Sequence, residues 1–352
     1  MNDLVLYLSA FSLSALGTNF QKKTNNYKLL RYIIILFFPV CLATFRIGVG
    51  TDYQNYMWGY NAIIRGAKTQ YEILFTYLNK FTHLVFGDFS GVLFFSAIIT
   101  YGCVLETVEK YKSDISVGIA MWVFYCFYYS ASLNVMRQLI AVGIVFLSSF
   151  FLNNDKYKYF FALLIIATLF HTSALITLTF VLIKIASKKN CTLTILITII
   201  TSFFLMFFSN TLINLFSNFL DVKYNGYIKH DTYLGLSYIL DIIPTFLIVG
   251  IPAMYYLTIC RRDTRYDFYC CLSTFCLPIL ILGANIEFFQ RIVYYFDISQ
   301  VIMVPLILKR TGNKTSKTIL MILYIAFYAF YFWYSSVYRM SNEIIPYRCW
   351  FF

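Results

Sequence analysis

The stretch Arg46–Tyr56, which reads R-I-G-V-G-T-D-Y-Q-N-Y, is the first place where this apolar chain gathers groups that could do chemistry. Arg46, Asp52 and Tyr53 stand beside glycines that leave the loop free to move. An arginine can bind an anion, and a carboxylate on a movable loop can accept a proton. We therefore expect these three residues to border an active site on the outer surface of a bundle of membrane helices.

Composition restricts the class of protein. The 352 residues are 60% hydrophobic and 12% charged, which indicates an all-α, polytopic integral membrane protein rather than a set of soluble domains. The net charge of +12 comes from lysines and arginines scattered over short loops, with no basic block beside stacking aromatics, so nucleic acid is excluded as a partner. The nine cysteines show no C-x-x-C spacing, and we expect no metal site and no disulfide framework.

Apolar runs of about 20 residues, or fewer where a helix stops short, predict about twelve transmembrane or re-entrant helices. They lie near 4–17, 29–45, 89–108, 115–131, 134–152, 157–170, 173–186, 191–209, 238–259, 267–284, 291–308 and 317–337. Two longer polar stretches, 46–88 and 210–237, form loops on the outer face, and the first contains an amphipathic interfacial helix at Tyr71–Phe86. No repeat or change of composition marks a boundary, so residues 1–352 are predicted to form a single membrane domain.

The stretch 157–186 decides the topology, because one helix of that length would extend about 45 Å while a bilayer core is about 30 Å thick. A hairpin there places 18 of the 28 lysines and arginines on one side, whereas a single span divides them almost evenly. The positive-inside rule favours the hairpin, with both termini and the 46–88 loop outside the cytoplasm. The residues on the basic side are Lys22, Lys23, Lys28, Arg31, Lys110, Lys112, Lys156, Lys158, Lys184, Lys188, Lys189, Arg261, Arg262, Arg265, Lys309, Arg310, Lys314 and Lys317.

Three polar residues then fall at a similar depth, a little below the outer surface. From the helix rise, Arg137, His171 and Arg291 stand about 20–25 Å above the inner ends of their helices. An arginine at that depth costs a few kcal/mol and needs a wet cavity and a partner. Arg137 and Arg291, with Arg46 as a third candidate, are therefore predicted to hold a pyrophosphate.

Two alternatives stay open at this point. Each arginine could instead snorkel to the interface or form an ion pair with Asp52, Glu287 or Asp297. The general base is either His171, whose ordinary pKa suits neutral pH, or Asp52 on its glycine-flanked loop.

These residues also carry a family resemblance. The segments are R-x-G-x-G-T-D-Y-x-x-Y at 46–56, L-N-x-x-R-Q-x-I-A at 133–141, F-H-T-S-A-L-I at 170–176, Q-R-I-V-Y-Y-F-D at 290–297 and I-P-Y-R at 345–348. In this order, over almost the whole chain, they resemble the signature blocks of the EpsG family, which are Wzy-like polymerases of bacterial polysaccharides.

The resemblance implies a GT-C-like membrane bundle in the bacterial inner membrane, with its active site facing the periplasm. It implies a metal-independent glycosyltransferase without a cofactor, which joins polyprenyl-pyrophosphate-linked oligosaccharide repeat units into O-antigen or a related polymer. The expected partners are the lipid-linked donor and acceptor and the membrane lipids, with a chain-length regulator protein as an open addition. The rival function is a flippase of lipid-linked oligosaccharides, but the repeated halves and midplane polar groups of a transporter are not evident.

The residue patterns and the resemblance together give two sets of predicted site residues. The catalytic set is Asp52, His171, Arg137 and Arg291. The substrate-binding set is Arg46, Tyr53, Asn134, Gln138, Glu287, Gln290, Tyr347 and Arg348.

Overall fold

A computed structural model describes residues 2–19, 28–217, 249–250, 252–258, 263–283 and 287–350, without the side chains of 209–217, 287 and 288. The structure is 84% helical, and its described residues contain no strand. Six of the described helices are long and apolar enough to cross a membrane. The prediction of an all-α membrane protein is confirmed, while the count of about twelve helices and the GT-C likeness stay predictions.

The chain forms two compact units, Met1–Leu175 with Asn313–Phe352, and Ile176–Gly312. The single membrane domain predicted from the sequence remains a prediction. The first unit contains α1 (Asn2–Gly17), α2 (Lys28–Thr44), α3 (Tyr53–Ile64), α4 (Ile73–Phe86), α5 (Ser90–Lys110), α6 (Val117–Asn134), α7 (Met136–Asn153), α8 (Tyr157–Phe170), α16 (Lys314–Trp333), the π-helical turn η4 (Tyr334–Tyr338) and the 3₁₀ turn η5 (Ser341–Glu343).

The first unit is a bundle in which helices that are neighbours in the chain and helices far apart in it both pack together. Helix α7 packs against α5 and α8, and α6 packs against α1 and α16. Its core is aromatic: Tyr7, Phe11, Tyr125 and Tyr129 are fully or almost fully buried and meet edge to face or stacked. Such ring pairs stabilise a core by about 0.5–1.5 kcal/mol each beyond the area that they bury. Many of the chain's aromatic residues therefore hold helices together.

Contacts at the two ends of this bundle agree with the predicted alternation of helix directions. At one end, Lys28 and Arg31 at the start of α2 pair with Glu106 and Glu109 near the end of α5, at 3.1 and 2.6 Å. At the other end, the backbone N–H of Tyr347 donates to the carboxylate of Asp3 at 3.1 Å. Asp3 and Tyr347, which are both predicted to lie outside the cytoplasm, thus meet within the first unit.

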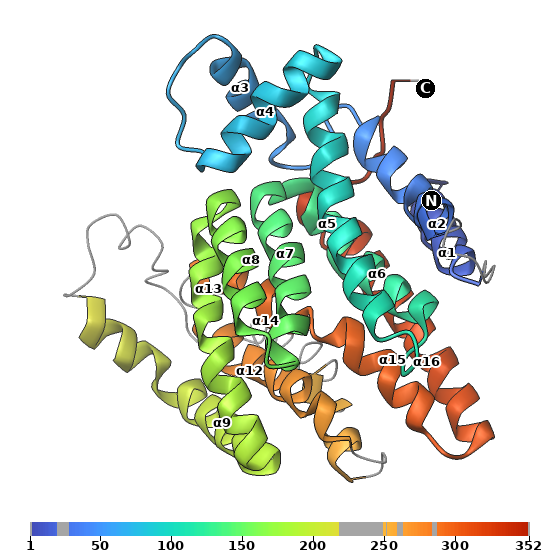
Figure 1. The fold of residues 1–352 in the computed structure, drawn as a ribbon, viewed down its shortest axis with the longest axis vertical. Helices are drawn as coiled ribbons and strands as arrows, with labels where there is room; N and C mark the ends of the chain where they lie inside the picture. The colour runs from blue at the N-terminus through green and yellow to red at the C-terminus, as the bar shows by residue number, and fades with distance from the viewer. Residues whose placement is uncertain are drawn as a thin grey trace. The chain divides into compact units, whose positions relative to one another are not determined.

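The stretch 46–88 is more ordered than a loop, because it contains two helices that lie side by side at one end of the bundle (Figure 1). Helix α4 matches the amphipathic helix predicted at Tyr71–Phe86, and it ends at Gly87, whose left-handed φ of 76° suits a helix C-terminus. Helix α3 was not predicted. It buries Tyr53, Tyr56 and Tyr60 at a spacing of three to four residues, which places them on one helix face.

The described part of the second unit is arranged around α12 (Asp267–Gly283), which packs against α9 (Thr179–Ser217), α13 (Glu287–Ile292), α14 (Tyr294–Asp297) and α15 (Gln300–Arg310). The span predicted at 291–308 corresponds to α13, α14 and α15, and Phe289–Arg310 is one of the six candidate membrane spans. The spans predicted at 173–186 and 191–209 correspond to the 3₁₀ turn η2 (Thr172–Leu178) and to α9, which is kinked at Asn190. The side chain of Asn190 accepts from the N–H of Leu193 at 3.0 Å and so caps the second half of α9.

Two predicted segments lie wholly or partly outside the described residues. Helix α9 continues to Ser217, so the loop predicted at 210–237 is helical where it begins, and its remainder is not described. The reason is that apolar residues continue beyond the point where the count of about 20 per span ended the predicted helix. Of the span predicted at 238–259, only residues from 249 onward are described, and not all of those.

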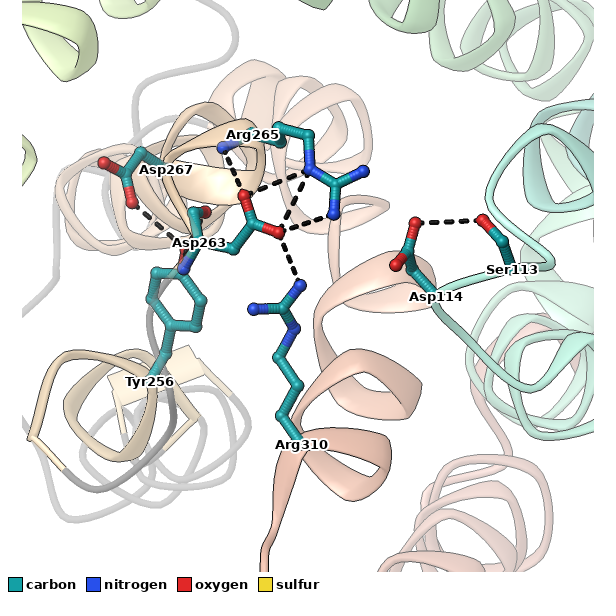
Figure 2. A network of polar contacts seen from close by, with 7 residues as sticks. All are labelled: Ser113, Asp114, Tyr256, Asp263, Arg265, Asp267 and Arg310. Carbon is teal, nitrogen blue, oxygen red and sulfur yellow. Dashed lines mark hydrogen bonds and ion pairs between the residues drawn. The ribbon is translucent and has the colours of Figure 1, made fainter.

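An acidic residue joins two elements of the second unit. Figure 2 shows Arg265, from the 3₁₀ turn η3 (Thr264–Tyr266), and Arg310, at the end of α15, converging on the carboxylate of Asp263 at 2.7 and 2.6 Å. The N–H of Arg265 donates to the same carboxylate, which caps the turn. These contacts lower the pKa of Asp263, the largest effect being the hydrogen bonds from Arg265. Asp263 therefore stays ionised and fixes the start of α12 to the end of α15.

Candidate functional site

Three elements of the first unit bring a carboxylate, a guanidinium and an imidazole together. Glu72 directly precedes α4, Arg137 lies in the first turn of α7, and His171 follows the last residue of α8. The Glu72 Oε2 atom accepts from Nη1 of Arg137 at 2.5 Å, and Oε1 lies 2.8 Å from Nδ1 of His171. The N–H of Thr172 also donates to Oε1, at 3.3 Å. Glu72 is thus the shared partner of two predicted catalytic residues.

Tyr71 completes this arrangement, which we call the Glu72 cluster: Glu72, Arg137, His171 and Tyr71. The guanidinium of Arg137 lies over the ring of Tyr71, 4.5 Å from its centroid. Tyr71 in turn rests on Gly59 of α3, where an added Cβ would overlap the hydroxyl and ring of Tyr71. Gly59 therefore lets Tyr71, and with it the guanidinium of Arg137, approach α3.

The carboxylate of Glu72 stays ionised at neutral pH. Burial by itself raises the pKa of Glu72, but the hydrogen bond from His171 and the charge of Arg137 outweigh burial and lower this pKa to about 2. The side chains of Glu72, Arg137 and His171 keep 13%, 23% and 25% of their surface exposed. A ligand can therefore reach the cluster, and Glu72 meets it as a carboxylate.

The signature loop 46–56 forms a second arrangement, the Arg46 hub: Arg46, Gly50, Asn134 and Asn342. Arg46 is 1% exposed and donates to the carbonyl of Val49 and to the sulfur of Met136 at 3.1 and 3.5 Å. Its guanidinium lies 5.7 Å from the ring centroid of Tyr53. Among the described residues Arg46 has no carboxylate partner, and burial lowers its pKa. This arginine is enclosed by protein groups.

Asn134, the last residue of α6, fixes the loop to the C-terminal segment. Its Oδ1 accepts from Thr51 Oγ1 and the N–H of Asp52 at 3.0 and 3.1 Å, and its Nδ2 donates to the carbonyl of Asn342 at 3.0 Å. Gly50 is required here, because its φ is +103° and an added Cβ would lie 2.7 Å from the Asn134 oxygen. Asn134 is 1% exposed, so its side chain is used within the protein.

The C-terminal segment closes the hub from the other side. The N–H of Ile47 donates to the carbonyl of Arg348 at 2.9 Å, and an isolated antiparallel bridge joins Arg46 to Cys349. The hydroxyl of Tyr347 donates to the carbonyl of Leu42 at 3.0 Å. The predicted substrate-binding residues Tyr347 and Arg348 thus use backbone and hydroxyl groups to hold the tail, and only the Arg348 side chain is exposed.

The other predicted site residues divide between the units. In the first unit, Asp52 is half-buried at the start of α3, Tyr53 is buried against Phe89, and Gln138 is buried on α7. In the second unit, Arg291 is exposed on α13, and Nε2 of Gln290 donates to the carbonyl of Gly283 at 2.8 Å. The side chain of Glu287 lies outside the described part of the chain. The roles predicted for these residues stay predictions.

Sequence reasoning missed Glu72. The ion-pair partners considered for the arginines were Asp52, Glu287 and Asp297, whereas the described partner of Arg137 is Glu72. A signal was present, because the stretch 46–88 contains only three acidic residues, Asp52, Glu72 and Asp88, and a deep arginine needs a counter-charge. Glu72 lies near the start of the amphipathic helix predicted at Tyr71–Phe86, and no role was predicted for it.

In the comparison with known proteins, the model of one family matches this chain. The model of the EpsG family matches residues 29–349, which is most of the chain and includes both the Glu72 cluster and the Arg46 hub. No curated protein and no solved structure matches the chain. The chain thus belongs to the EpsG family, a bacterial family whose membership indicates a Wzy-like polymerase or a related membrane glycosyltransferase.

Proposed function

We propose that the protein is a polysaccharide polymerase, of the O-antigen kind, which joins polyprenyl-pyrophosphate-linked oligosaccharide repeat units on the outer face of the bacterial inner membrane. The observation that supports this proposal best is the sharing of Glu72 by Arg137 and His171. An accessible guanidinium and an imidazole in one place supply an anion-binding group and a proton acceptor. In glycosyl transfer from a pyrophosphate, the first group acts on the leaving group and the second on the attacking hydroxyl.

The growing chain serves as the donor and its lipid pyrophosphate as the leaving group. A hydroxyl of the acceptor unit attacks the anomeric carbon, and the carbon–oxygen bond to the pyrophosphate breaks with its electron pair on the departing oxygen. Arg137 stabilises the charge that develops there, because its fork of N–H donors fits phosphate oxygens. We take Arg291 as the second pyrophosphate ligand, because the helix rise predicts it at a depth similar to that of Arg137.

Between the two candidate bases, the contacts favour His171. It shares a carboxylate with Arg137, so a proton acceptor and a phosphate ligand lie within one cluster. Asp52 lies at the start of α3, with its backbone N–H bound to Asn134. We therefore assign the proton transfer to His171 and keep Asp52 as the competing base.

The proposed location of the site on the outer face follows from the distribution of lysines and arginines along the chain. The hairpin topology places most lysines and arginines in the cytoplasm, and the helix directions in the first unit gather Glu72, Arg137 and His171 at the opposite end. Lipid-linked repeat units would then meet the protein after export, in a bundle of about twelve helices that we take to be GT-C-like. On this scheme neither a metal nor a cofactor takes part.

Deletion of the gene tests the function. We expect surface glycan to fall to a lipopolysaccharide core capped by a single repeat unit, because units are still made and exported but not joined. Complementation with His171→Ala should leave the same single-unit pattern, and complementation with Asp52→Asn should restore polymer. A bare core would instead place the block before export and would assign the protein to transport of lipid-linked units.

A further inference from the structure

Glu72 is placed so that both carboxylate oxygens are used within the protein. It occupies the N-terminal cap position of α4 without capping the helix, since its side chain bonds to none of the first N–H groups. The side chain extends instead to the start of α7 and to the turn after α8, where Oε2 meets Arg137 and Oε1 meets His171 and the N–H of Thr172. The Glu72 side chain therefore contacts groups of two other elements and none of the first N–H groups of its own helix.

The ionised state of Glu72 determines which nitrogen of His171 carries the proton. A carboxylate has acceptors and no donor, so the imidazole nitrogen that faces it must present an N–H. That nitrogen is Nδ1, 2.8 Å from Oε1. In neutral His171 the lone pair then lies on Nε2, on the far side of the ring from Glu72. Only in this tautomer can Nε2 take a proton from a substrate.

We propose that Glu72 is a positioning residue for catalysis, which holds neutral His171 in the Nδ1–H tautomer so that Nε2 accepts the proton of the attacking acceptor hydroxyl. This inference rests on the proposed glycosyl transfer. In the step itself, the hydroxyl oxygen forms the bond to the anomeric carbon while its proton passes to Nε2 of His171. The pyrophosphate leaves with the electrons of the broken bond, and the imidazolium, stabilised by the Glu72 carboxylate, releases its proton to water before the next cycle.

Glu72 has a second effect through Arg137. The bond to Oε2 and the ring of Tyr71 hold the guanidinium from two sides, so its orientation is set before the donor arrives. The other titratable groups near the pair are Tyr56, which hydrogen-bonds to Arg137, and Asp52. Glu72 is the described residue that contacts both the guanidinium and the imidazole, and its removal should disturb both.

The first test measures the tautomer directly. The chain has three histidines, so ¹⁵N-histidine labelling of the full-length protein in lipid gives a spectrum in which the His171→Ala variant assigns His171. We expect His171 of the wild type to show a protonated Nδ1 and an unprotonated Nε2 above the pH at which its ring becomes neutral. In Glu72→Gln the amide can donate to the ring, and the Nε2–H form should appear. A wild-type His171 with its proton on Nε2 overturns the proposal.

The second test measures turnover with repeat units extracted from a strain that lacks this gene. Glu72→Gln should lower kcat by roughly 10²–10⁴-fold, as loss of a general base does, and the larger part of the loss should fall on kcat rather than KM. Glu72→Asp keeps the charge and should recover at least about tenfold over Glu72→Gln. On a His171→Ala background, Glu72→Gln should add much less than it does alone, because the proton transfer is already lost.

Asp88→Asn is the matched control, because Asp88 is a carboxylate of the same stretch that bonds only locally, to Ser90 at 2.9 and 2.5 Å. It should stay within about twofold of wild type. Wild-type kcat in Glu72→Gln, or full additivity with His171→Ala, overturns the positioning role while leaving the polymerase intact. If the wild type itself joins no units, the proposed function fails, and the tautomer measurement still decides what Glu72 does to His171.

Discussion

The Glu72 cluster and the Arg46 hub each contain an arginine from a signature segment, yet the two arginines are held in opposite ways. Arg137 pairs with a carboxylate and keeps 23% of its side chain exposed, whereas Arg46 is 1% exposed and has carbonyl, sulfur and tyrosine neighbours. A buried charge without a counter-ion is expensive and is retained only where the surrounding structure holds it. The difference teaches that the same residue type in two signature segments can be held by an opposite charge in one place and by neutral groups in the other.

The largest expected effect separates the arginines by activity. Arg137→Lys should lower polymerisation by roughly 10²–10³-fold, because lysine has no planar fork for a phosphate and stacks poorly on Tyr71. Protein level in the membrane and the thermal unfolding midpoint should change little. Chain-length analysis of surface glycan together with a membrane immunoblot checks this. Wild-type polymer in the lysine variant would remove Arg137 from pyrophosphate binding.

Arg46→Lys should lower the stability of the protein and leave its turnover almost unchanged. Lysine cannot reproduce the two directed bonds to Val49 and Met136, so we expect a loss of about 2 kcal/mol in stability and a lower unfolding midpoint in detergent. Turnover per folded molecule should remain within about threefold of wild type. An unchanged midpoint combined with lost turnover would move Arg46 into the substrate site and abolish the contrast between the two arginines.

Acid should destabilise the protein in part through the Glu72 cluster. The pKa of Glu72 is lowered from 4.5 to about 2, so its contribution is complete above pH 4.5 and is lost as the pH falls toward 2. We expect about 1–2 kcal/mol of the acid destabilisation to come from this residue, after allowance for screening by solvent. Denaturation midpoints at pH 6 and pH 3 for wild type and Glu72→Gln measure it. Equal acid sensitivity in both proteins contradicts the assignment.

The smallest predicted effect concerns Gly59, the residue on which Tyr71 of the Glu72 cluster rests. In Gly59→Ala the new methyl displaces Tyr71 and shifts the surface on which Arg137 lies, which should reduce turnover by about three- to tenfold. Gly102→Ala is the matched control, because Gly102 is also helical and an added Cβ meets nothing within 4 Å. A Gly59→Ala protein as active as Gly102→Ala would show that Tyr71 does not position Arg137.

Several features were determined by the sequence alone. Long apolar runs define membrane helices because an unpaired backbone polar group in lipid is too costly for irregular structure, and this argument places most of the helices of the first unit within a few residues. Helix rise and charge counting placed Arg137 and His171 at a similar height before any contact was known, since both depend only on distance along the chain. The spaced segments from Arg46 to Arg348 identified the family.

What the tertiary structure decided is which polar groups meet. Glu72, Arg137 and His171 are separated by at least 34 positions along the chain, and neither helical periodicity nor hydropathy relates residues that far apart. The same holds for the Arg46 hub, where Asn134 bonds to Thr51 and to Asn342 and where Arg46 is bridged to Cys349, all across long separations in the sequence. Sequence patterns predict the local secondary structure and which helices are apolar enough to cross a membrane. The choice of partner for a charge depends on the packing of α4, α7 and α8, where the carboxylate of Glu72 extends from the start of α4 to groups on its neighbours.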